Sequence, residues 1–238
     1  MMHSLSRALL ATATLFLSVT GIAAAQASAS TTALSRQFSR IDFGISAVGQ
    51  FTGTVSGPIV PTGASNCYIG PPFTGPCTNV VAQYASNTVG ASGDIRYIAK
   101  PYIGVEFNYV WGRYTENYSP APNGNSSFQV QTTSNEYSFG WVVTPPHPIF
   151  GFQPFASAGA GTNQFKPTAG GGNGAPHQFR ATYYYNVGLQ KEILNSSFGI
   201  RVAFRETFYL APDFGQNYLT ILKHTTTIQP NAGFYYRF

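Results

Sequence analysis

The sequence has little charge, few cysteines and no long apolar run after its first residues. Asp, Glu, Lys and Arg make up 9% of its 238 residues, against about 25% in an average soluble protein. The low charge argues against a disordered acidic or basic tail, and a coiled coil would contain more Glu, Lys and Leu. The 13 Lys and Arg residues form no basic cluster, so nucleic-acid binding is not expected.

The N-terminus has the organisation of an export signal. Residues 1–25 contain one charged residue, Arg7, followed by an apolar stretch and an Ala-x-Ala sequence that ends at Ala25. This pattern predicts a cleaved signal peptide, because the apolar stretch is shorter than a membrane-spanning helix requires. A second Ala-x-Ala at Ala27 and Ala29 offers an alternative cleavage site. We therefore expect a periplasmic N-terminal segment over residues 26–39 and a folded domain over 40–238.

The two cysteines, Cys67 and Cys77, lie in a segment rich in glycine and proline. In an exported protein, two cysteines this close together most often form a disulfide. No histidine or further cysteine lies nearby, so a metal site is not expected there. The sequence predicts a disulfide at the tip of an exposed loop.

After residue 40 the apolar residues recur at every second position. Seven segments show this period: 41–47, 89–97, 103–111, 137–143, 179–189, 198–204 and 230–238. An eighth, 152–162, is rich in small residues that hide which face is apolar. A period of two predicts β-strands with one apolar and one polar face, and a helical period fits none of the segments.

Long and short connections alternate between these segments. The long ones are 53–85, 113–127, 163–177 and 211–221, and the short ones are 99–101, 144–151 and 192–197. Long loops at one end and short turns at the other are typical of outer-membrane barrels. The sequence therefore predicts an all-β fold, an eight-stranded antiparallel up-and-down transmembrane β-barrel.

The position of the charges favours a membrane barrel over the alternative, a secreted β-sandwich. The alternate strand positions that form the polar face hold four acids and four bases: Asp42, Asp94, Glu106, Glu136, Arg96, Arg180, Arg201 and Arg205. Such a neutral set can pair inside a narrow barrel, whereas the water-facing side of a sandwich would contain many Lys and Glu. Aromatic residues near the strand ends, such as Trp111 and Trp141, fit interfacial girdles.

Two positions conflict with simple alternation. Phe128 and Val130 have the opposite parity to Tyr137 and Trp141, so this strand either contains a bulge or leaves the membrane early. Glu206 has the apolar parity of its strand, which places it at or beyond the rim.

The C-terminal strand carries a resemblance to a known family. Phe234, Tyr236 and the terminal Phe238 are apolar at every second position, like the signal that the outer-membrane assembly machinery recognises. With the export signal and eight strands, residues 40–238 resemble the small eight-stranded outer-membrane β-barrels of the OmpA and OmpX type. The resemblance implies export to the cell outer membrane, contact with the barrel-assembly machinery during biogenesis, and contact with membrane lipid and lipopolysaccharide.

The expected function is structural or interactive, through long extracellular loops that contact an unidentified surface ligand. Eight strands leave an interior that side chains fill, so no large pore is expected; a narrow porin-like channel is the first alternative. The second is a lipid-modifying enzyme of the lipid A deacylase type. His224 lacks the His-x-Ser pairing of that family, because Thr226 follows it. We expect no catalytic residue, metal ligand or cofactor.

Overall fold

The computed structural model describes residues 37–59, 67–68, 74–75, 80–99, 102–119, 128–194, 197–216 and 219–238. The chain divides into two units, Met1–Ser39 and Arg40–Phe238, and the described strands belong to the second. The predicted signal peptide lies outside the described residues, as does most of the predicted periplasmic segment. Within the described residues, no helix has the length and apolar character needed to cross a bilayer.

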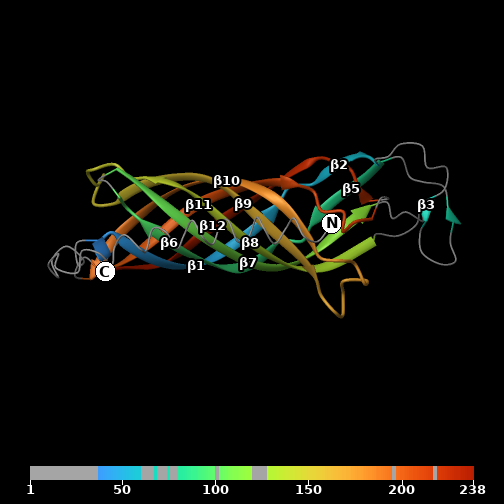
Figure 1. Cartoon of the computed structure of the whole chain (residues 1–238), viewed down its shortest axis with the longest axis horizontal. Helices are drawn as coiled ribbons and strands as arrows, with labels where there is room; N and C mark the ends of the chain where they lie inside the picture. Colours follow the sequence, from blue (N-terminus) through green and yellow to red (C-terminus); the bar gives the residue numbers. More distant parts are fainter. Residues whose placement is uncertain are drawn as a thin grey trace, which may run out of the picture. The chain divides into compact units, whose positions relative to one another are not determined.

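Eight antiparallel strands close into a barrel (Figure 1). They are β1 (Ile41–Thr52), β6 (Thr88–Tyr97), β7 (Ile103–Ser119), β8 (Phe128–Val143), β9 (Gln153–Pro167), β10 (Gln178–Leu194), β11 (Phe198–Leu210) and β12 (His224–Arg237). Each strand pairs with its neighbours in this series, and β12 pairs with β1 to close the sheet. The predicted all-β, eight-stranded up-and-down barrel is confirmed.

The strands are staggered around the barrel. From Phe43 on β1, successive cross-strand partners lead around the sheet to Thr226 on β12. The direct partner of Phe43 on β12 is instead Tyr236, ten residues further along the strand. Closing a sheet into a barrel requires such a stagger together with strand tilt, and eight strands enclose an interior that side chains can fill.

The two ends of the barrel differ in their connections. The turn end has the connections 98–102, 144–152 and 195–197, together with the start of β1 and the end of β12. The loop end has the connections 53–87, 120–127, 168–177 and 211–223. The longest connections lie at the loop end, as the sequence predicts, but the division by length is incomplete, because the turn-end connection 144–152 is one residue longer than the loop-end connection 120–127.

The longest connection, 53–87, contains further strands. β2 (Val55–Pro58) pairs with β5 (Val80–Ala85), and β5 also pairs with the last residues of β7. Between them, β3 (Cys67–Tyr68) and β4 (Thr74–Gly75) form a small hairpin. The long connection predicted near 53–85 is therefore present, and strand pairing within it continues beyond the eight strands of the barrel.

The outer face is apolar over the part of the barrel nearer the turn end. On β7 the outward side chains from Ile103 to Trp111 are apolar or aromatic, and on β12 the same holds from Ile228 to Phe238. These spans of nine and eleven residues match the roughly 9–11 residues of a tilted transmembrane strand. We call this ring of outward side chains the apolar band. The side chains that face the lumen at the same level are largely polar.

Between the apolar band and the loop end the pattern is inverted. On β7, Arg113 and Thr115 face outward, whereas Tyr114 and Tyr118 are buried in the lumen. On β8, Val130 is fully buried. This part of the barrel therefore has the pattern of a soluble protein, with a polar exterior and an apolar core.

The inversion accounts for the parity of Phe128 and Val130. β8 pairs with β7 residue for residue from Val143 to Phe128, and this register contains no bulge. Of the two explanations that the sequence allowed, the bulge was wrong. The strand continues beyond the apolar band, where the inner face becomes the apolar one.

Candidate functional site

Arg201 on β11 joins two carboxylates across the lumen. Its NH2 group lies 3.0 Å from Asp42 Oδ1 on β1, and its NH1 group donates to Asp94 Oδ2 on β6. The Nε and NH2 groups also donate to Gln190 Oε1, at 3.3 Å and 3.1 Å. The Arg201 side chain is 3% exposed, and the ring of Tyr235 lies 4.8 Å from its guanidinium carbon. Arg201 thus links strands that are far apart in the sequence.

Arg96 and Glu106 form a second ion pair beside the first. They are cross-strand partners on β6 and β7, and Arg96 Nε lies 2.8 Å from Glu106 Oε2 and 3.5 Å from Asp94 Oδ2. Asn108 Nδ2 donates to Glu106 Oε1 at 3.0 Å. The guanidinium carbon of Arg96 lies 4.2 Å from the ring centroid of Phe155, so a cation–π contact covers the face of this charge.

Tyr184 on β10 connects this pair to a third. Its hydroxyl donates to Glu106 Oε1 at 2.9 Å, and its ring lies 4.1 Å from the guanidinium carbon of Arg205. Arg205 in turn pairs with Glu136 on β8. A Cβ atom at Gly140 would lie 2.4 Å from the Tyr184 hydroxyl oxygen, so a larger residue there would displace the hydroxyl from Glu106.

The structure brings together seven of the eight predicted lumen charges, but Arg180 is placed elsewhere. Arg180 faces inward near the loop end of β10 and pairs with Asp213, 3.0 Å away. Arg237 takes its place: it lies 3.5 Å from Asp42 Oδ2 and 2.8 Å from Glu192 Oε1. The parity of Arg237, between two outward aromatics, was the signal that sequence reasoning missed.

We call the resulting set the lumen network. It consists of Asp42, Asp94, Arg96, Glu106, Glu136, Arg201, Arg205 and Arg237, and still contains four acids and four bases. A cavity of about 20 Å³ lies beside it, lined in part by Arg201, Arg205, Asn186, Gln229 and Asn231. A space of that size holds about one water molecule. Paired side chains of the lumen network thus occupy the lumen around this cavity.

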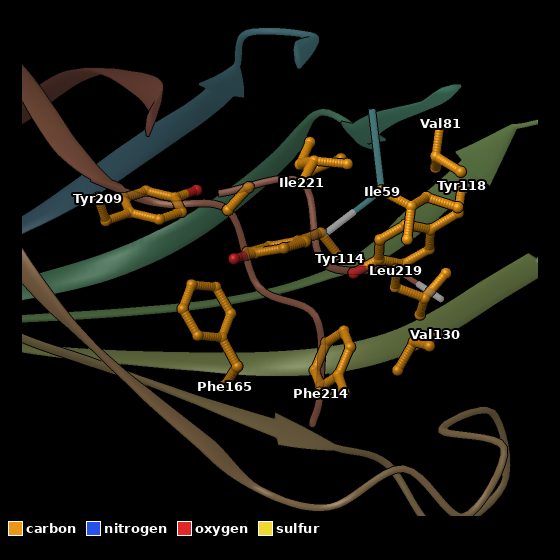
Figure 2. Close-up of a cluster of buried hydrophobic side chains, with 12 residues drawn as sticks. Ile59, Val81, Tyr114, Tyr118, Val130, Phe165, Tyr209, Phe214, Leu219 and Ile221 are labelled. Atoms are coloured by element: carbon orange, nitrogen blue, oxygen red, sulfur yellow. The ribbon is translucent and has the colours of Figure 1, made fainter. Parts of the chain in front are cut away.

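An apolar core closes the lumen at the loop end (Figure 2). Its members are Ile59, Val81, Ala85, Tyr114, Tyr118, Val130, Phe165, Tyr209, Ala211, Phe214, Leu219 and Ile221. Several strands contribute, together with the connection between β11 and β12. We call this set the loop-end core. It is a second layer of packed side chains between the lumen network and the loop end.

Asp213 fastens the β11–β12 connection to the barrel. Its carboxylate pairs with Arg180 and accepts hydrogen bonds from Gln178 Nε2 at 2.6 Å, Gly215 N at 3.0 Å and Thr220 Oγ1 at 2.9 Å. Burial alone would raise the pKa of Asp213, but these hydrogen bonds and the charge of Arg180 lower it below its ordinary value. The next residue, Phe214, has a φ of 49° and a fully buried ring. Its packing offsets the cost of a left-handed backbone.

Glu116 is a buried carboxyl group that forms no ion pair with any of the described cations. It is 1% exposed and lies on β7 beyond the apolar band, between the core residues Tyr114 and Tyr118. Gln83 Nε2 donates to Glu116 Oε2 at 3.2 Å, whereas no described residue forms a hydrogen bond with Oε1. Burial raises the pKa of Glu116 to about 7, and the hydrogen bond from Gln83 opposes this only in part. Sequence reasoning missed Glu116, because it treated residues 113–127 as a loop.

Comparison with solved structures identifies the fold. OprG, an outer-membrane protein of Pseudomonas aeruginosa, is 12% identical, covers 83% of this chain and 95% of its own, and superposes with a TM-score of 0.54. The chain has the fold of the small eight-stranded outer-membrane barrels. Comparison of the sequence with family models finds no match, and neither does comparison with curated proteins.

Two further outer-membrane barrels superpose with lower scores. The neisserial surface protein NspA is 10% identical, covers 82% of this chain and 97% of its own, and has a TM-score of 0.46. Ail of Yersinia pestis, in complex with the heparin analogue sucrose octasulfate, is 14% identical, covers 84% and 99%, and has a TM-score of 0.44. The fold assignment rests on the barrel geometry and the OprG superposition.

The C-terminal residues lie at the turn end of the barrel, beside the strand with which β12 closes it. Phe234, Tyr236 and Phe238 face outward at the turn end. The ring of Phe238 lies 5.6 Å from that of Phe43 on β1 and 5.1 Å from that of Tyr236. These contacts lie where β12 meets β1 and closes the barrel.

Three predicted residues remain: His224 and the two cysteines, Cys67 and Cys77. His224 is exposed at the loop end of β12, and none of the described carboxylates pairs with it. Cys67 lies on β3, opposite Gly75 of β4, whereas Cys77 lies outside the described residues. The disulfide between them stays a prediction.

Proposed function

We propose that this protein is an outer-membrane β-barrel with a structural or surface-interaction role. The apolar band lies in the lipid, the turn end faces the periplasm, and the loop end projects from the cell with its long loops. The observation that carries this proposal is the inversion of the strand faces. A barrel that is apolar outside and charged inside suits lipid, whereas the same strands beyond Trp111 suit water; the level of inversion therefore corresponds to a membrane surface.

The charges of the outer face support this placement. On the eight barrel strands, four charged side chains have outward positions: Arg113, Lys166, Lys191 and Glu206. Lys191 lies near the turn end, and Arg113 and Lys166 lie beyond the apolar band. Glu206 lies within the band, opposite Ile228, where its carboxylate accepts a hydrogen bond from the Tyr185 hydroxyl. The one acid that would face lipid thus shares its charge with a neighbouring donor.

The closed lumen supports a role other than bulk diffusion. The lumen network and the loop-end core fill two successive levels of the barrel. A hydrated solute larger than water would have to displace both an ion-pair network and packed aromatic side chains. We therefore expect no stable nanosiemens conductance in planar bilayers, and such steps would overturn this part of the proposal.

Two substitutions on outward positions of β7 test the membrane placement. Phe107→Arg puts a charge in the middle of the apolar band and should cost about 2–4 kcal/mol of unfolding free energy in a bilayer. Thr115→Arg makes the same addition beyond Trp111 and should cost about 0.5 kcal/mol or less. The measurement is urea unfolding in liposomes. Equal costs for the two variants would contradict the proposed membrane level.

Localisation has its own test. In purified outer membranes, the unheated protein should migrate apart from the boiled protein on a denaturing gel, because a folded membrane barrel resists the detergent. Identical migration, or recovery of the protein in the soluble periplasmic fraction, would contradict the proposal.

A further inference from the structure

Arg113 and Lys166 lie in one row on the outer face, beyond the apolar band. Arg113 on β7 pairs with Thr133 on β8, and Thr133 pairs with Lys166 on β9 (strands labelled in Figure 1). With a strand spacing of about 4.8 Å, the two basic residues are about 10 Å apart along the sheet. Arg113 is two residues beyond Trp111, which on a tilted strand is about 5 Å further from the bilayer centre. This is the level of lipid headgroups.

The guanidinium of Arg113 is held in place by neighbouring residues. Its NH2 group donates to Gln131 Oε1 at 2.8 Å, and Thr168 Oγ1 donates to the same oxygen at 3.0 Å. The backbone of Gln131 exchanges hydrogen bonds with the connection after β9, through Gly171 O and Thr168 N. This connection therefore borders the row, and Arg113 remains exposed, with Gln131 as the one side-chain partner of its guanidinium among the described residues.

The carboxylates of the chain are engaged elsewhere. Of its eight Asp and Glu residues, six face the lumen or the loop-end core: Asp42, Asp94, Glu106, Glu116, Glu136 and Asp213. Glu192 pairs with Arg237, and Glu206 accepts from Tyr185 on a different part of the outer face. No described carboxylate forms an ion pair with Arg113 or Lys166. Among the described residues, the row is thus a basic site without a carboxylate partner.

We propose that Arg113 and Lys166, with Thr133 between them, bind a phosphate group of lipopolysaccharide in the outer leaflet. This inference rests on the proposed membrane placement and adds a specific lipid contact to it. The lipid is favoured over free phosphate because the row adjoins the apolar band, so a bound lipid can pack its acyl chains below Trp111 while its phosphate meets the two charges. Arg113 supplies a planar donor pair, and Lys166 adds a second positive charge at a distance that its side chain can span.

The experiment uses the mature chain refolded in non-ionic detergent. The chain has two tryptophans, and Trp141→Phe in every variant leaves Trp111 as the only fluorescent one. Lipopolysaccharide is titrated into the parent and into Arg113→Gln, Lys166→Gln and the double variant, and the fluorescence of Trp111 is followed. Each substitution should weaken binding about 5-fold, and the double variant about 25-fold. Lys191→Gln makes the same charge change at the turn end and should leave the affinity unchanged.

Dephosphorylated lipopolysaccharide separates the phosphate contact from general lipid binding. It should bind the parent as weakly as intact lipopolysaccharide binds the double variant. Equal affinity of the parent for both lipids would overturn the proposal, as would an unchanged double variant or full displacement of the lipid by excess inorganic phosphate. If all variants show the heat-dependent gel shift yet one of these results is found, the phosphate site alone is wrong. Absence of the shift in the parent would overturn the membrane placement as well.

Discussion

Replacing Arg201 by methionine tests whether paired charges stabilise the lumen. The variant leaves Asp42 and Asp94 buried without their shared partner, and removing one side of a buried pair typically costs about 3–5 kcal/mol. Each carboxylate keeps a more distant cation, since Arg237 lies 3.5 Å from Asp42 and Arg96 lies 3.5 Å from Asp94. We therefore expect a loss near the lower limit, about 3 kcal/mol of unfolding free energy.

The assay is guanidinium unfolding of the refolded barrel in detergent, followed by tryptophan fluorescence. Adding Asp94→Asn to Arg201→Met should restore at least half of the loss, because one uncompensated charge is then removed. Arg237→Met is the control: its side chain is 24% exposed, so it should cost about 1 kcal/mol or less. If Arg201→Met costs as little as this control, or if Asp94→Asn makes it worse, the lumen network does not stabilise the barrel as we argue.

Three further predictions concern other parts of the chain. Glu116 has its pKa raised from 4.5 to about 7, so the folded state binds its proton more tightly and loses stability between these pH values, by about 3 kcal/mol in all. Glu116→Gln should therefore match the parent at pH 4.5 and exceed it at pH 8 in unfolding experiments; a parallel pH profile would contradict this. Deletion of Phe238 should slow insertion in cells, whereas Phe43→Ala, which removes one of the two ring contacts of Phe238, should not; equal rates for both would argue against an assembly signal. Under denaturing, non-reducing conditions, neither Cys67 nor Cys77 should react with a thiol reagent, and labelling of both would rule out the disulfide.

The period of two was sufficient to predict the fold at the level of the apolar band. Within the segment 103–111, the lipid outside favours apolar side chains and the charges inside favour polar ones. Apolar and polar residues therefore alternate in one fixed order along the whole segment. The same holds for 198–204 and 230–238. The number of strands and their up-and-down order follow from this pattern and from the alternation of connection lengths.

The pattern failed where the solvent changes. β7 continues to Ser119 and β8 begins at Phe128, whereas the period of two ends at residue 111 in the first strand and allows either a bulge or an early exit from the membrane in the second. Beyond the band, water lies outside and the loop-end core inside, so the apolar parity switches without any change in the backbone. When the same face of a strand is assumed to be apolar along its whole length, the part in which the other face is apolar looks like a loop.

The pairing of the charges could not be predicted from parity alone. Arg180 and Arg201 both face inward, but the stagger of the strands and the length of β10 place Arg180 beside Asp213. Parity tells which side of the sheet a residue faces, whereas its height in the barrel depends on the register of all eight strands. Arg237 lies at the level of Asp42 in the barrel, because β12 ends beside the start of β1. Arg180 lies at a different level, nearer the loop end.

The two layers that close the lumen depend on different interactions, and their order follows from the solvent outside. At the level of the apolar band the exterior is apolar, so the polar side chains of the strands point inward, where specific pairing satisfies them. At the loop end the exterior is polar, and apolar side chains can gather inside without exposing surface to water. Glu116 is the exception: it places a carboxyl group in the apolar layer, with Gln83 as its donor. Its protonation therefore acts on the layer that closes the loop end, while the lumen network below keeps its own paired charges.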